Sequence, residues 1–138
     1  MTPRAALPGD ALTGLHARFP DKYPVLLESV GGGAALGRYD VLLALPGPHL
    51  VQTADGSVRD QRRHLQPRFL DSLDAWFCEE RVPAAGREAP FVGGWFLYLG
   101  YELAAEVEPS LALPRSRHAR ASAWRMRGAV VRDRVSGE

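Results

Sequence analysis

The sequence predicts an α+β fold in which antiparallel β-sheets carry flanking helices. Three observations support this class: short apolar runs end at glycine and proline turns, one segment has helical periodicity, and one later segment alternates between apolar and polar residues. The order of strands, helix and strands favours an antiparallel sheet. The 138 residues match the length of one domain, and 46% apolar with 24% charged residues is typical of a soluble globular protein.

The N-terminal part, residues 1–22, is predicted to be a peripheral segment with one short helix. In DALTGLHARF (10–19) the leucines and the phenylalanine recur at helical spacing. The next run, YPVLLESV (23–30), is rich in strand-forming residues and stops at three consecutive glycines. We therefore expect a strand followed by a turn.

Two further strands are expected directly afterwards. LGRYDVLLALPGP (36–48) resembles a strand that ends at Pro-Gly-Pro, and HLVQT (49–53) resembles a third strand. The pair Asp55-Gly56 follows, and Asp-Gly is a strong hairpin signal. The three strands together indicate an antiparallel meander.

The middle of the chain changes to a helical period. In PRFLDSLDAWFCEE (67–80) apolar residues recur three and four apart while acids take the other faces, which predicts an amphipathic helix. ELAAEVEPSLALP (102–114) is long enough for one or two helical turns before its prolines.

The last element is predicted to be a half-buried strand. In ASAWRMRGAVVRDR (121–134), residues Trp124, Met126, Gly128 and Val130 alternate with arginines and an alanine. This period of two is typical of a strand with one buried and one solvated face.

FVGGWFLYLGYE (91–102) combines three glycines with five aromatic rings. Its glycine spacing fits neither a phosphate-binding loop nor a dinucleotide fingerprint. We expect Gly93 and Gly94 to form a tight turn that leads into a buried strand, and Gly100 to permit a close approach of backbone. This framework role is favoured over a catalytic loop.

Several classes of protein are disfavoured by the sequence. No apolar run approaches the roughly 20 residues of a membrane helix, and the N-terminus lacks a secretory layout, so we expect a cytoplasmic protein without a membrane partner. Charges of both signs are interspersed, which argues against a nucleic-acid partner. The single Cys78 forms no metal or redox motif, and no histidine pair has ligand spacing.

Two kinds of polar side chain are candidates for a functional site. The acids Glu79, Glu80, Glu106 and Glu108 are interpreted as solvated surface charge, because nothing local would perturb their pKa values. The pair Glu28-Ser29 closes an apolar strand just before a glycine turn. It either caps that turn or contributes to a ligand site, and composition and spacing leave both readings open.

The strings YPVLLESV, GRYDVLLALP and PFVGGWFLYLGYELAAEVE, then a strand ending VVRD, follow one another in this order. Together they resemble the N-terminal domain of component I of anthranilate synthase and aminodeoxychorismate synthase, over residues 20–134. The GRYD form and the short spacing after LLES resemble the aminodeoxychorismate (para-aminobenzoate) enzyme more. The resemblance implies that residues 23–138 form the anthranilate synthase component I N-terminal-like domain and adopt that part of the fold.

The resemblance also implies a tryptophan-binding pocket. Ser29 matches the serine of the family pocket, and Leu36, Gly37, Arg38 and Tyr39 match its following-strand segment. A hydroxyl and backbone groups can hold an amino-acid zwitterion while an aromatic neighbour faces the indole. No catalytic and no metal-binding residue is assigned, because the family binds chorismate and magnesium in a C-terminal chorismate-binding domain.

The implied function is that of a non-catalytic domain, and we expect the chain to be such a domain or a fragment, inactive alone. Its implied partners are the chorismate-binding domain, a glutamine amidotransferase subunit and L-tryptophan, and no cofactor is expected in the chain itself. The family enzyme converts chorismate and glutamine to 4-amino-4-deoxychorismate for folate synthesis. The alternatives are a free-standing tryptophan-binding or glutaminase-docking module, and the same domain of anthranilate synthase.

Overall fold

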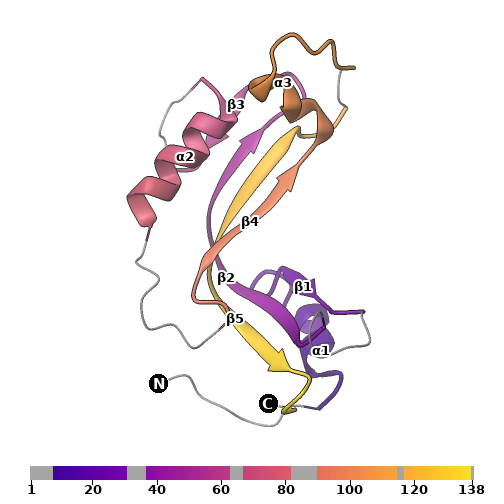
Figure 1. Ribbon diagram of the computed structural model, residues 1–138. Helices are drawn as coiled ribbons and strands as arrows, with labels where there is room; N and C mark the ends of the chain where they lie inside the picture. Colours follow the sequence, from indigo (N-terminus) through magenta and orange to yellow (C-terminus); the bar gives the residue numbers. More distant parts are fainter. Residues whose placement is uncertain (1–7, 31–36, 63–66, 82–89, 115–116, 138) are drawn as a thin grey trace. The chain divides into compact units, whose positions relative to one another are not determined.

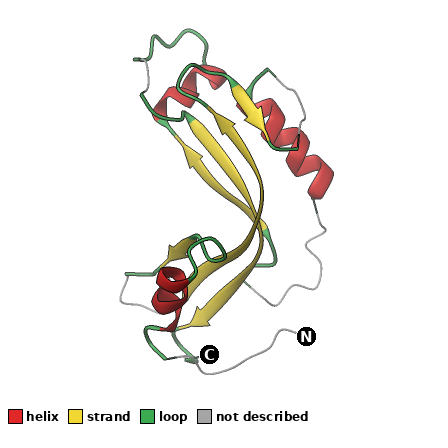
Figure 2. Ribbon diagram, turned by 180° about the vertical axis from the view of Figure 1, so that it is seen from behind, coloured by secondary structure: helices red, strands yellow, loops and turns green. Residues whose placement is uncertain are grey.

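The computed structural model describes residues 8–30, 37–62, 67–81, 90–114 and 117–137. It combines helices with an antiparallel sheet, which confirms the predicted α+β class (Figures 1 and 2). The sheet has five strands in the order β1-β2-β5-β4, and β3 also pairs with β2. The elements are α1 (Ala11–Arg18), β1 (Val25–Leu27), β2 (Tyr39–Gln52), β3 (Val58–Asp60), α2 (Phe69–Glu80), β4 (Gly94–Leu99), the 3₁₀ helix η1 (Tyr101–Leu103), α3 (Ala104–Val107) and β5 (Ala121–Asp133).

The chain divides into two compact units, each made from separate stretches of sequence. Unit 1 comprises residues 1–46, 87–94 and 126–138, and unit 2 comprises residues 47–86 and 95–125. Strands β2 and β5 therefore contribute residues to both units.

Unit 1 contains α1, β1, the first part of β2 and the second part of β5. The predicted helix over 10–19 is confirmed, and Leu12 is its buried residue. The predicted strand over 23–30 is confirmed in its centre, where Leu26 of β1 lies opposite Leu42 of β2. Leu42 and Met126 are fully buried, so apolar side chains from β2 and β5 form the core of this unit.

The prediction that Pro-Gly-Pro ends a strand is wrong. Strand β2 runs without interruption from Tyr39 to Gln52, so the two strands predicted over 36–48 and 49–53 are one. Residues 41–43 of β2 pair with β1, and residues 50–52 pair with β3. Pro46 and Pro48 lie between these two paired segments. The prolines therefore remove no donor from those two ladders. The backbone irregularity falls at Leu45, which has a positive φ of 56°.

Unit 2 has a core between α2 and the sheet. The helix predicted over 67–80 is confirmed, and its Phe69 and Trp76 are fully buried. They pack with Leu50 of β2 and with Ala121 and Ala123 of β5. The predicted Asp-Gly hairpin is also confirmed: Gly56 has a φ of 92°, and β2 and β3 continue on either side of the turn.

The glycine-rich stretch forms a turn and a strand, but the strand is not buried. Gly93 has a φ of 111°, which only glycine adopts readily, and this confirms the predicted turn. The strand that follows, β4, is partly buried over its first half and exposed from Leu97 to Leu99, so the prediction of a buried strand is wrong. The predicted helical turns after it are confirmed as η1 and α3.

The alternation predicted for β5 holds for only part of the strand. Ala121, Ala123 and Met126 are fully buried, so the buried side changes from odd to even positions between Ala123 and Met126. Trp124, predicted to face inward, is only partly buried and lies against the ring of His49 with centroids 5.2 Å apart. The change coincides with the boundary between the units, because Ala121 and Ala123 belong to unit 2 and Met126 belongs to unit 1. Among the described helices, none has the length and apolar character to cross a membrane.

Candidate functional site

Ser29 lies just after β1 and is bound to the first residues of β2. Its hydroxyl donates to the carbonyl oxygen of Tyr39 at 2.9 Å, and its backbone N–H donates to Oδ1 of Asp40 at 3.0 Å. Both contacts follow from the antiparallel pairing that places Leu27 opposite Val41. The hydroxyl hydrogen is thereby engaged, while the oxygen lone pairs of Ser29 can still accept a hydrogen bond.

Arg38 directly precedes Tyr39, and its side chain is exposed to solvent. Its guanidinium lies over the ring of Tyr39, 5.0 Å from the centroid, and forms an ion pair with Asp133 at 2.6 Å. The hydrogen bonds that Arg38 donates to the Asp133 carboxylate raise the pKa of Arg38 and lower the pKa of Asp133. Arg38 is half-exposed, so this pair adds little to stability but orients the guanidinium.

A buried carboxylate connects these residues to β5. Asp40 is only 3% exposed. Its Oδ2 forms ion pairs with the guanidinium groups of Arg132 at 2.9 Å and of Arg134 at 3.9 Å. Arg134 also donates to the carbonyl oxygen of Ser29. A buried charge needs such partners, because an unpaired carboxylate would be strongly destabilising. We call Ser29, Arg38, Tyr39, Asp40, Arg132, Asp133 and Arg134 the Ser29 cluster.

The Ser29 cluster contains three of the five residues predicted for the tryptophan pocket. Ser29, Arg38 and Tyr39 lie together, and Gly37 is buried immediately before Arg38. Leu36 lies outside the described residues. The arrangement presents guanidinium groups, a hydroxyl oxygen and an aromatic ring, which are groups that can bind a carboxylate, an ammonium and an apolar ring respectively.

Sequence reasoning missed Asp40, Arg132 and Arg134. A signal was present for the arginines, because residues two apart in a strand point to the same face and RDR therefore places both on one side. No local signal identified Asp40 as buried, since its arginine partners are some ninety residues away in the sequence and only the fold brings them together.

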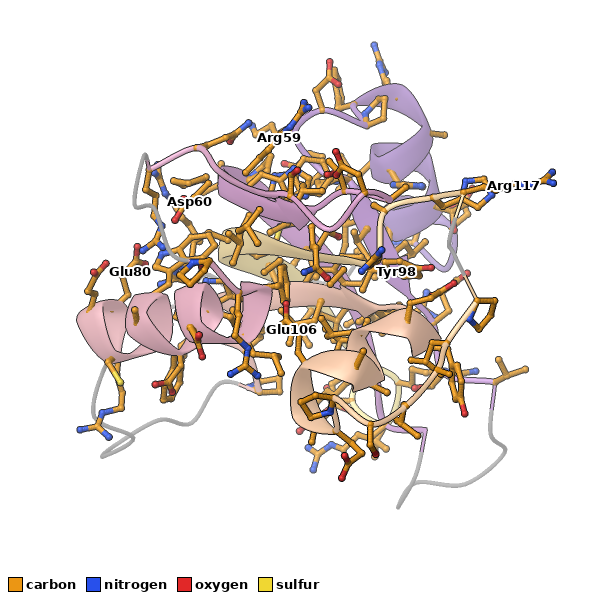
Figure 3. All side chains as sticks on the ribbon, turned by 90° about the horizontal axis from the view of Figure 1, so that it is seen from above. Arg59, Asp60, Glu80, Tyr98, Glu106 and Arg117 are labelled. Carbon is orange, nitrogen blue, oxygen red and sulfur yellow. The ribbon has the colours of Figure 1, made fainter. Side chains whose placement is uncertain are left out.

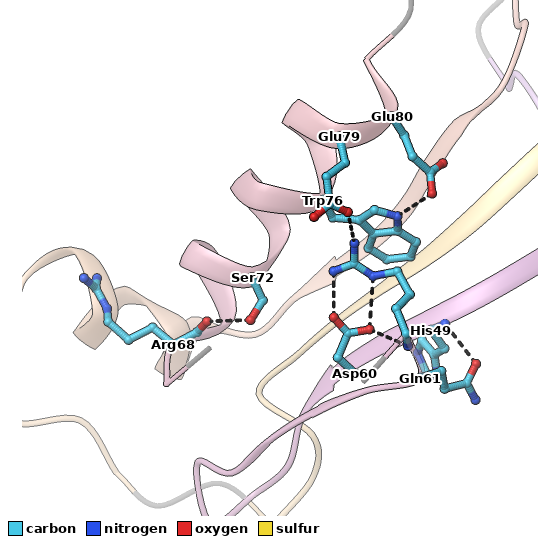
Figure 4. A network of polar contacts seen from close by, with 9 residues as sticks. His49, Asp60, Gln61, Arg68, Ser72, Trp76, Glu79 and Glu80 are labelled. Carbon is cyan, nitrogen blue, oxygen red and sulfur yellow. Dashed lines mark hydrogen bonds and ion pairs between the residues drawn. The ribbon is translucent and has the colours of Figure 1, made fainter. Parts of the chain in front are cut away.

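Glu79 and Glu80, two of the acids interpreted as solvated surface charge, take part in a polar network in unit 2 (Figure 4). Glu80 accepts from Nε1 of Trp76 at 2.8 Å and pairs with Arg125 at 2.5 Å. Burial raises the pKa of Glu80, but the hydrogen bonds from Arg125 and Trp76 outweigh it and lower the pKa below its ordinary value. Glu79 pairs with Arg62 at 2.9 Å. Glu79 is exposed on α2, which confirms the interpretation as surface charge, whereas the interpretation is wrong for Glu80.

Glu106 departs furthest from that interpretation. Its carboxylate accepts the backbone N–H of Phe69 at 3.0 Å and of Leu70 at 2.9 Å, and the side-chain amide of Gln52 at 2.7 Å. Glu106 thus lies beside the first turn of α2 (Figure 3) and takes the place of a local cap, because Arg68 at the N-cap makes no capping hydrogen bond. Its role in the fold is structural.

Metal-ligating residues do not gather in the part of the chain that the structure describes: no group of three His, Cys, Asp or Glu side chains could hold an ion there. His16 donates a hydrogen bond from Nδ1 to the carbonyl oxygen of Tyr23 at 2.7 Å, and His49 lies against Trp124. Burial lowers the pKa of His49. Cys78 is exposed on α2.

Comparison with protein-family models gives no match for this chain, and a search of curated proteins finds no significant similarity. The resemblance to the component I family therefore stays a prediction. The assignment of a function rests on the residue strings and on the geometry of the Ser29 cluster.

Proposed function

We propose that this chain is the non-catalytic N-terminal domain of a component I of aminodeoxychorismate synthase, acting in the cytoplasm. With its chorismate-binding domain and a glutaminase partner, such an enzyme converts chorismate and glutamine to 4-amino-4-deoxychorismate for folate synthesis. The observation that carries the proposal is the contact of Ser29 with Tyr39, because these residues come from the two strings that resemble the family pocket.

The chemistry of the Ser29 cluster suits the backbone groups of an amino acid such as L-tryptophan. The Ser29 oxygen can accept from an ammonium, since its own hydrogen is donated to Tyr39. The guanidinium of Arg38 has N–H groups beyond those used by Asp133 and can bind a carboxylate. An indole would pack beside the Tyr39 ring, whose face already carries the guanidinium of Arg38.

The magnesium of the family does not fit the described residues of this chain, which offer no converging set of acidic ligands. We assign it to the chorismate-binding domain and route no step of the reaction through the present residues. The role left to this domain is to support that catalytic domain and to complete an amino-acid pocket.

Reconstitution tests the proposal. The purified chain is mixed with a separately produced chorismate-binding domain of an aminodeoxychorismate synthase, ammonia, magnesium and chorismate. We expect no product from the chain alone, and faster formation of 4-amino-4-deoxychorismate when both parts are present than with the chorismate-binding domain alone. Product from the chain alone, or no binding and no rate change on mixing, would contradict the proposal. A parallel mixture with the corresponding domain of an anthranilate synthase distinguishes the two branches.

A further inference from the structure

Strand β4 forms an edge of the sheet in unit 2. Among the described residues it pairs with β5 alone. The extended residue Gly100 donates its N–H to the carbonyl of Arg120, which precedes β5, at 2.7 Å. Backbone groups of alternate residues in a strand point to opposite sides. The N–H and C=O groups of Leu97 and Leu99 therefore point away from β5, toward the open edge.

Within the described residues, this edge shows little of the usual protection against pairing. Leu97, Tyr98 and Leu99 are 42%, 51% and 53% exposed. Residues 94–101 contain no charged residue and no proline. Natural edge strands usually carry a lysine, a proline or a bulge that prevents another strand from adding to them. The chemistry of the open edge, with unpaired backbone groups and apolar side chains, fits another β-strand.

We propose that this edge binds a second copy of the chain, with the two β4 strands antiparallel about a two-fold axis. Such pairing places residues 94–101 against themselves, so no like charges face one another and apolar side chains meet apolar side chains. A two-fold contact is self-complementary and closes at two copies.

An apolar groove beside the edge adds to this surface. It has a volume of about 420 Å³ and is lined by Leu70, Leu73, Asp74 and Phe77 of α2 and by Leu97 of β4. Leu97 belongs to both groove and edge, so a strand added along β4 brings apolar side chains next to the groove. A strand pair this short is smaller than the roughly 1,200 Å² of a stable interface, and we expect a dissociation constant in the micromolar range.

Sedimentation velocity of the purified chain tests the proposal, with two substitutions at one position. Leu99→Pro removes an N–H that points to the open edge, whereas Leu99→Ala removes the side chain and keeps the N–H. We expect the wild-type chain to be dimeric at about 100 µM, Leu99→Ala to dimerise with a dissociation constant raised less than about tenfold, and Leu99→Pro to stay monomeric. A wild-type monomer at that concentration, larger open assemblies, or a Leu99→Pro variant that is folded by circular dichroism and dimerises like wild type would overturn the proposal.

Amide hydrogen exchange on the wild-type chain gives a second measurement that depends on no variant. We expect exchange at Leu97 and Leu99 to slow as the concentration rises, because their N–H groups become paired in the dimer. Val107 on α3, which is exposed and lies away from β4 in the sequence, serves as the control and should not change. Exchange at Leu97 and Leu99 that is independent of concentration would overturn the proposal even if the chain self-associates by another surface.

Discussion

Gly100 approaches the backbone of Arg120 so closely that no side chain fits between them. The N–H of Gly100 donates to the Arg120 carbonyl at 2.7 Å, and a Cβ on Gly100 would lie 2.7 Å from that same oxygen. The glycine predicted to permit close approach therefore does so, and the hydrogen bond joins the end of β4 to the start of β5.

We expect Gly100→Ala to destabilise the fold. The clash is with a backbone oxygen, which cannot move without disturbing β5, so the free energy of unfolding should fall by about 1 to 3 kcal/mol. Urea denaturation followed by circular dichroism measures the change. Gly14→Ala is the matched control, because a Cβ at this position in α1 meets nothing within 4 Å and should be neutral or stabilising by up to about 1 kcal/mol. Equal effects of the two substitutions would contradict the steric argument.

Glu106→Gln should weaken the start of α2. The amide offers one acceptor oxygen where the carboxylate offers two, so either Phe69 or Leu70 loses the partner of its N–H. We expect a loss of about 1 to 3 kcal/mol in the free energy of unfolding. Glu108→Gln is the control, since this exposed side chain accepts only from Ser110, and should change stability by less than about 0.5 kcal/mol. A similar loss from both variants would show that Glu106 does not cap the helix.

Asp55 should titrate at unusually low pH. The hydrogen bond from Thr53 at 2.5 Å, and a second from the Ser57 N–H, lower its pKa from 3.8 to about 2. Because the folded-state pKa is depressed, the stabilising contribution is present above pH 3.8 and is lost as the pH falls through about 2. Carboxyl carbon chemical shifts measured against pH give the midpoint. Thr53→Val should raise it toward 3.8, whereas Thr13→Val in α1 should leave it unchanged.

Tryptophan binding tests the Ser29 cluster directly. In the chain joined to a chorismate-binding domain, Ser29→Ala should lower the affinity for L-tryptophan by about ten- to a hundredfold. The reason is that one hydrogen bond to a charged ligand group is worth about 1.5 to 3 kcal/mol. Isothermal titration calorimetry measures the affinity, and Ser110→Ala serves as the control at an exposed serine that binds Glu108. Unchanged affinity after both Ser29→Ala and Tyr39→Ala would show that tryptophan binds elsewhere.

The elements that sequence reasoning identified are those specified by local patterns. The helix over Phe69–Glu80 follows from its apolar period, and the turn at Gly56 from the Asp-Gly pair. The continuity of β2 through Pro46 could not be read locally, because a proline breaks a strand only where its missing N–H would be needed in a ladder.

The same distinction applies to the sites. Ser29 and Tyr39 could be identified because both lie in recognisable strings, only ten residues apart. Asp40 and Glu106 could not, because their charges are buried or oriented by residues far away in the sequence. A carboxylate appears solvated in a sequence until the fold shows which backbone and guanidinium donors surround it.

The composition of the two units constrains how the chain folds during synthesis. Unit 1 includes residues 126–138 as well as residues 1–46. The core of unit 1 therefore lacks the buried Met126 until the residues that precede Met126 have been synthesised. Leu42 and its neighbours on β2 are synthesised early, whereas β5, which lies beside β2 in the sheet, is synthesised late. The contact between β2 and β5 joins residues far apart in the sequence and is hence slow to form. During that interval the nascent chain exposes an apolar strand without its partner, which is the situation in which chaperones bind newly made proteins.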